Sequence, residues 1–186
     1  MKPPRWITVA ESEFAWEREA LDWLRERLPD TDPWLAWSNF EFIDDDGKVN
    51  EVDLLVLAPG GLFLVEIKSR PGVLTGDART WTWITDGREF TYENPLYRAN
   101  RKAKRLAALL RRQPSFLRSR ERFPWVEPAI FLSSTSLNCK LQATAAAKVY
   151  LRGRPGAPGD NGIVAALHAP LTLGADGTPA RVDSRQ

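Results

Sequence analysis

The feature that most constrains the fold is a pair of strongly apolar segments, residues 51–57 and 62–69, separated by a short stretch with a Pro-Gly pair. Proline followed by glycine is typical of a tight turn, so the two segments predict a β-hairpin whose paired residue numbers sum to 119. This register sets Asp53 opposite Glu66, with Lys68 on the same face. The other face would carry Val52, Leu54, Val56, Phe63, Val65 and Ile67.

The three charged residues of this hairpin indicate a chemical site. Residues two apart on a strand point the same way, so Glu66 and Lys68 project together beside Asp53. Two carboxylates and an ammonium beside an apolar sheet are costly to desolvate unless they are paired, and a divalent cation would pair them. The alternative is a surface salt-bridge trio on an edge strand, contributing about 0–1 kcal/mol per exposed pair.

Two scarce residue types narrow the chemistry. The 186 residues include one cysteine, Cys139, and one histidine, His168. A disulfide within the chain, a thiolate zinc site and a two-histidine metal site are therefore excluded. A metal should be a hard cation held by carboxylates, such as Mg²⁺ or Mn²⁺. No apolar run approaches the roughly 20 residues of a membrane span, so we expect a cytoplasmic protein without a membrane partner.

The remaining pattern predicts an α/β fold with a central mixed β-sheet flanked by helices. Helices are expected at 11–28, from the Asn94-Pro95 cap to 113, and at 163–168, and strands at 34–42, 73–75, 81–85, 89–92, 128–133 and 148–152. The strands at 73–92 are expected to extend the central sheet. The chain divides into an extension at 1–10, one domain at 11–170, and a linker at 171–186 toward a further domain.

The first predicted helix carries one acid on its core-facing side. At about 100° per residue, the apolar stripe contains Phe14, Leu21, Leu24 and Leu28, and Glu17 lies inside it. Glu13 and Glu19 are alternatives to Glu17 for a role at the site. Trp16 and Trp23 fall on the opposite side and predict an apolar patch, to be covered by a further domain or by a second copy of the chain.

The formal net charge of +2 hides a strong separation of charge. Residues 1–53 carry a net charge of −8, whereas residues 98–122 carry +9. Basic residues often only solvate a helix face, but such an excess is also what phosphate binding requires. The candidate nucleic-acid contacts are Arg98, Arg101, Lys102, Lys104 and Arg105.

The ordered motifs resemble a known family. Asp53, Glu66 and Lys68 match the D…ExK core of the PD-(D/E)XK nucleases, which have a restriction-endonuclease-like core. The longer stretch, with V-D-L-L-V, G-L-F-L-V-E-I-K and the later N-P, is similar to the nuclease-related domain called NERD. Glu17 matches the family's helix acid by position. Trp16 replaces a usual glycine and Arg98 replaces a usual glutamine.

This resemblance implies a nuclease that hydrolyses DNA with Mg²⁺ or Mn²⁺, RNA not being excluded as substrate. Asp53, Glu66 and the Ile67 carbonyl would hold the metal, Glu17 would complete the shell or hold a second cation, and Lys68 would orient the attacking water. The segment is also similar to the N-terminal region of large kinases in bacterial phage-defence systems of the BREX, phage-growth-limitation or methylation-associated type.

Two other functions stay open at this point. The first is a nucleic-acid-binding or sensing module that cuts little and serves a larger defence kinase, which Arg98 in place of glutamine favours. The second is a protein-interaction platform built on the Trp16 and Trp23 face, with neither metal nor DNA bound.

Overall fold

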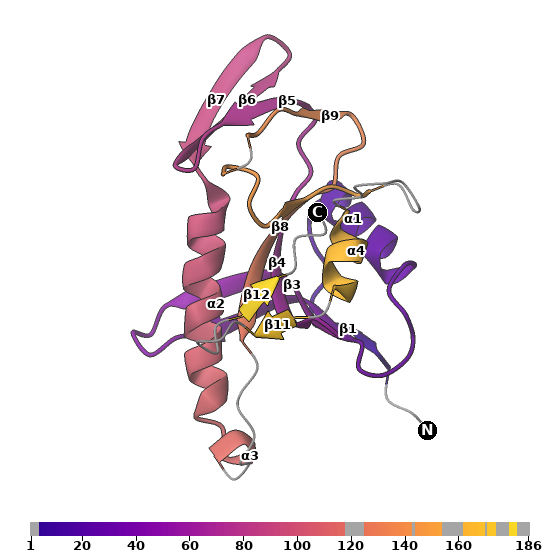
Figure 1. Cartoon of the computed structure of the whole chain (residues 1–186), viewed down its shortest axis with the longest axis vertical. Helices are drawn as coiled ribbons and strands as arrows, with labels where there is room; N and C mark the ends of the chain where they lie inside the picture. Colours follow the sequence, from indigo (N-terminus) through magenta and orange to yellow (C-terminus); the bar gives the residue numbers. More distant parts are fainter. Residues whose placement is uncertain are drawn as a thin grey trace.

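The computed structural model describes residues 4–117, 125–142, 144–153, 162–169, 171–173 and 179–181. The fold is α/β, as the sequence predicts, with two mixed sheets and helices packed against them (Figure 1). Among these residues, no helix has both the length and the apolar character needed to cross a membrane.

The six-stranded central sheet has the order β1-β2-β3-β4-β8-β10. Its strands are β1 (Trp6–Thr8), β2 (Leu35–Ile43), β3 (Val49–Ala58), β4 (Gly61–Lys68), β8 (Val126–Leu132) and β10 (Val149–Tyr150). The predicted hairpin register is confirmed, because Leu57 pairs with Leu62 and Leu54 with Val65. On its other side β4 pairs with β8 in parallel, and every residue of β8 is buried.

The described residues form four helices: α1 (Ala15–Arg25), α2 (Pro95–Arg111), α3 (Pro114–Leu117) and α4 (Ile163–His168). Helix α2 packs on one face of the central sheet, while α1 and α4 cover the other (Figure 1). The predicted cap of α2 is confirmed, since the Asn94 side chain accepts the Leu96 N–H at 2.9 Å and Pro95 occupies the first helical position.

The strands at 72–93 form a separate sheet, and the prediction that they extend the central sheet is wrong. The four strands, in the order β7-β6-β5-β9, are β5 (Gly72–Gly76), β6 (Thr80–Thr85), β7 (Arg88–Glu93) and β9 (Leu137–Cys139). The edge of β4 that they would have used is occupied by β8. The chain leaves the central sheet after Lys68 and enters the second sheet at Gly72, where φ is +105° and a Cβ would lie 2.2 Å from the Ile84 carbonyl oxygen.

Helix α1 also differs from its prediction. It begins at Ala15, and Phe14 is 51% exposed and stacks on the exposed Trp16 with ring centroids 4.9 Å apart. Trp23 does not join an exposed patch, because its ring lies 5.6 Å from that of the buried Phe131 and the Arg152 guanidinium covers it. The predicted two-tryptophan surface is therefore reduced to Trp16 and Phe14.

In the segment predicted as a linker, the described residues form an antiparallel pair, β11 (Leu171–Leu173) with β12 (Pro179–Arg181). Part of the predicted basic segment, residues 118–122, lies outside the described residues.

Candidate active site

Asp53 lies where the two strands of the hairpin separate. The described β3–β4 pairing ends at Leu54 and Val65. One residue beyond, the Asp53 carboxylate accepts the Ile67 N–H at 2.7 Å, so a side chain replaces the backbone as partner of β4. Because the N–H and C=O of one strand residue point to the same side, the Ile67 carbonyl faces the same gap.

The side-chain alternation of β3 shifts at this position. Val52 belongs to the buried cluster under α2, whereas Leu54 belongs to the cluster under α1 and α4. The prediction that these two residues share a face is therefore wrong. The neighbouring strand β2 is irregular at the same level: Asn39, between the residues that pair with Leu54 and Val52, has a left-handed φ of 52°, which asparagine tolerates.

Glu66 is held by two lysines. Lys68 Nζ lies 3.0 Å from one carboxylate oxygen, and Lys102 Nζ lies 2.8 Å from the other. Lys102 comes from α2, and it was predicted only as a nucleic-acid contact. Its neighbour Ala103 and the earlier Ala99 are buried small residues that let α2 approach the sheet closely. That spacing is the sequence signal that could have placed Lys102 at the site.

Burial, the adjacent Glu66 carboxylate and, to a smaller extent, Glu17 together raise the pKa of Asp53 to about 7, against the lowering effect of the Ile67 N–H and Lys68. Burial would also raise the pKa of Glu66, but the charges of Lys68 and Lys102 and their hydrogen bonds outweigh burial and lower it. The two carboxylates therefore differ: Glu66 is ionised at neutral pH, and Asp53 titrates near neutrality.

Two hollows open on either side of the carboxylates. The first, which we name the acidic hollow, has a volume of about 570 Å³, and its lining includes Glu13, Glu17, Glu41, Glu51 and Asp53. Glu19 is turned toward Arg152 and does not line it. Glu17 is half-buried on α1, which supports it over Glu19 as the helix acid of the site.

The second, named the aromatic hollow, has a volume of about 380 Å³ and lies between β4 and the second sheet. Its lining includes Glu66, Lys68, Trp81, Trp83, Tyr92 and Arg98. The site residues predicted on the hairpin thus meet, and they are reached both from α1 and from the second sheet.

The donor set fits a hard divalent cation. Two carboxylates and a backbone carbonyl are oxygen ligands of the kind Mg²⁺ and Mn²⁺ prefer, and they leave positions for water and phosphate. Burial and, after it, the Glu66 charge raise the pKa of Asp53 because both penalise its ionised form, and a bound cation would relieve that penalty. Among the described residues, no group of three or more Asp, Glu, His or Cys side chains lies close enough together to hold a metal ion, so the candidate side-chain ligands are the pair Asp53 and Glu66.

The predicted nucleic-acid contacts divide into two groups. Lys102 pairs with Glu66. Arg105 lies 3.0 Å from the buried Asp44 and donates a hydrogen bond to Asn50, and these two contacts hold α2 against the turn before β3. The other three face solvent: Arg98 and Arg101 approach Glu93 only at 3.8 and 3.9 Å, and Lys104 is exposed.

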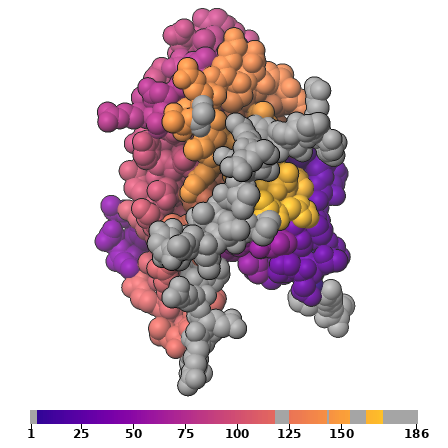
Figure 2. Space-filling view, viewed as in Figure 1, coloured from indigo at the N-terminus to yellow at the C-terminus, as the bar shows by residue number. Residues whose placement is uncertain are grey.

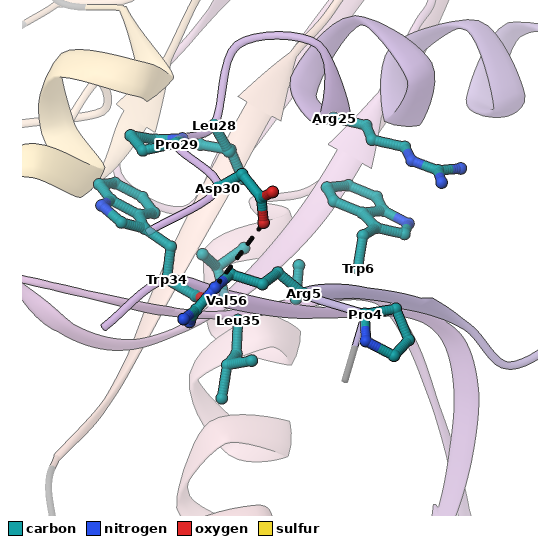
Figure 3. A pocket seen from close by; sticks show the side chains of 11 residues that line it. Pro4, Arg5, Trp6, Arg25, Leu28, Pro29, Asp30, Trp34, Leu35 and Val56 are labelled. Carbon is teal, nitrogen blue, oxygen red and sulfur yellow. Dashed lines mark hydrogen bonds and ion pairs between the residues drawn. The ribbon is translucent and has the colours of Figure 1, made fainter. Parts of the chain in front are cut away.

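A third cavity, of about 420 Å³, lies beside β1 and the end of α1, and neither Asp53 nor Glu66 lines it (Figure 3). Arg5 crosses its floor, 3.7 Å from Asp30 and 2.7 Å from Asp32, and donates to the Trp34 carbonyl. These contacts anchor the N-terminal strand to the loop after α1.

The hairpin thus brings an Asp, a Glu and a Lys together, and Glu17 of α1 lines the same hollow as Asp53. Residues 12–133 match NERD, the nuclease-related domain, and the chain belongs to this family. Over 151 residues it is 48% identical to the "Probable kinase PglW" of Streptomyces coelicolor. That match covers 81% of this chain but only 9% of the relative. No solved structure matches the chain significantly.

Proposed function

We propose that this domain is a metal-dependent nuclease that hydrolyses DNA phosphodiester bonds. One observation carries the proposal: Asp53, Glu66 and Lys68 converge at the open end of the β3–β4 hairpin, with the Asp53 pKa raised to about 7 by burial and by Glu66. Perturbed carboxylates in a cleft are typical of catalytic sites. The nuclease-related family supports the same assignment.

Asp53, Glu66 and the Ile67 carbonyl would hold one Mg²⁺ or Mn²⁺, and Glu17 would contribute from across the acidic hollow. Such a cation, when bound, lowers the pKa of a water ligand and neutralises charge on the phosphate. The protein's part is to keep these oxygens together in spite of their repulsion.

The two lysines have different tasks in this proposal. Lys68, with a side chain 36% exposed, is accessible to substrate and would orient the attacking water and screen the phosphate charge. Lys102, only 21% exposed, would keep Glu66 ionised and fixed. Arg98, Arg101 and Lys104 on the outer side of α2 would bind the DNA backbone, since their charges have weak or no partners among the described residues.

A second candidate is a DNA-binding or sensing module with little cleavage. Two ammonium groups already neutralise Glu66, which weakens the demand for a cation, and Arg98 stands where the family commonly has glutamine. The similarity to a probable kinase suits this candidate as well, with the domain serving a larger cytoplasmic defence kinase.

Incubation of supercoiled plasmid with the protein and Mn²⁺ tests the proposal. Wild type should nick the plasmid, EDTA should stop it, and Asp53→Asn and Lys68→Met should abolish it. The exposed Lys48→Met, on the turn before β3, is the matched control and should retain activity. Plasmid retention on a gel without nicking, lost at high salt, would select the second candidate.

A further inference from the structure

One face of the second sheet is aromatic. In the β6–β7 pairing, Trp81 lies opposite Tyr92 and Trp83 opposite Phe90, and directly opposed residues share a face. The two tryptophans are 1% and 5% exposed, whereas Phe90 is 37% and Tyr92 47% exposed. The face therefore runs from the core to solvent, and it ends in two accessible rings.

The opposite face of the same strands is polar. Thr82 and Thr91 lie opposite each other there, and their hydroxyls are 3.0 Å apart. The aromatic residues are thus gathered on the side of the sheet that lines the aromatic hollow.

Arg70 lies against the accessible rings. Its guanidinium carbon is 4.9 Å from the Phe90 ring centre and 5.6 Å from that of Tyr92, and it donates a hydrogen bond to the Tyr92 hydroxyl at 3.1 Å. A guanidinium has five N–H groups, so stacking leaves most of its donors available to an anion.

This surface is continuous with the catalytic residues. Tyr92 and Arg70 line the aromatic hollow together with Glu66 and Lys68. The second sheet stands at the end of the molecule where α2 begins, and Figure 2 shows its strands at the surface there. The hollow's volume of about 380 Å³ lies in the range of roughly 300–1,000 Å³ that is typical of small-molecule sites.

The hollow combines positive charge with ring surface. Lys68, Arg70 and Arg98 outnumber Glu66 and Glu93 along its lining. The Nε1 groups of Trp81 and Trp83 are closed to solvent and meet no acceptor within the described part of the chain. A ligand in the hollow would therefore contact ring surface, chiefly that of the exposed Tyr92, and neither indole N–H would donate a hydrogen bond to it.

We propose that the aromatic hollow binds one unpaired nucleotide of single-stranded DNA, with the base against Tyr92 and the phosphate among Arg70, Arg98 and Lys68. Ring faces and cations together bind single strands with little sequence preference. The bases of a duplex are stacked on each other and cannot offer a face to Tyr92. Naming this DNA the substrate rests on the proposed nuclease function, whereas the binding itself does not.

Fluorescence anisotropy with labelled dT20 and a 20-base-pair duplex, both in EDTA, tests the proposal. Wild type should bind dT20 more tightly than the duplex. Tyr92→Ala should weaken dT20 binding roughly five- to hundredfold, as expected for loss of one stacked base, and leave duplex binding unchanged. Tyr92→Phe, which keeps the ring, should bind dT20 within about twofold of wild type.

Tyr97→Ala is the matched control, because Tyr97 on α2 is 44% exposed and does not line the hollow. It should bind dT20 like wild type. Equal affinity for the two DNAs, or equal loss with Tyr92→Ala and Tyr97→Ala, would overturn the proposal. Because EDTA prevents cleavage, absence of plasmid nicking would refute the nuclease function without changing this result.

Discussion

Replacement of Asp53 by asparagine should stabilise the protein at alkaline pH. The Asp53 pKa is raised from 3.8 to about 7, chiefly by burial and by the Glu66 charge. At about 1.4 kcal/mol per unit, this shift corresponds to about 4 kcal/mol of unfolding free energy lost to holding the charged form. Asparagine has no charge and can still accept the Ile67 N–H.

The free-energy cost of ionising Asp53 in the folded protein depends on pH. Because the pKa is higher in the folded than in the unfolded state, the cost is absent below about pH 4, grows as the pH rises, and is complete above about pH 7. Asp53→Asn should therefore raise the unfolding free energy at pH 8 by about 2–4 kcal/mol, and the melting temperature by roughly 5–15 °C. At pH 4 the two proteins should melt together.

Thermal melting in EDTA at pH 4 and pH 8 measures this difference. Asp44→Asn is the matched control with opposite sign, because the Lys48 backbone N–H and other donors lower the pKa of Asp44. That group contributes stability above its unfolded pKa, so its replacement should destabilise the protein at pH 8. Destabilisation by Asp53→Asn at pH 8, or the same effect at both pH values, would refute the electrostatic reasoning.

Three further changes test other parts of the structure. Lys102→Met removes one of the two ammonium groups on Glu66 and should lower Mn²⁺-dependent nicking about tenfold or more, whereas unchanged nicking would remove Lys102 from the site. Phe63→Ala empties a fully buried position beneath α1 and α4 and should cost about 3–5 kcal/mol in urea unfolding; a cost below 1 kcal/mol would contradict the assigned core. Asn94→Ala removes the α2 cap and should lower the free energy of unfolding by about 1 kcal/mol in the same assay. Unchanged stability would contradict the assignment of Asn94 as the cap.

The parts of the fold that the sequence predicts well are those fixed by local chemistry. The Pro-Gly turn sets the register of β3 and β4, and Asn94 with Pro95 sets the start of α2. Asp53, Glu66 and Lys68 could be brought together from this register alone, because a hairpin leaves little choice of partner.

The parts that escaped prediction depend on distant segments. The strands after Gly72 form their own sheet because β8, more than fifty residues later, occupies the edge of β4. Lys102 reaches Glu66 only once α2 packs on the sheet. Asn39, whose left-handed backbone accompanies the change in side-chain alternation at Asp53, has no neighbouring glycine or turn motif from which this conformation could be predicted.

The proposed nuclease activity depends most directly on a divalent cation bound by Asp53 and Glu66. Titration calorimetry with Mn²⁺ at pH 8 should show one site per chain in the wild type, loss of that site in Asp53→Asn, and its retention in Asp44→Asn. Absence of Mn²⁺ binding to the wild type, or binding that Asp53→Asn leaves unchanged, would contradict the assignment of this centre.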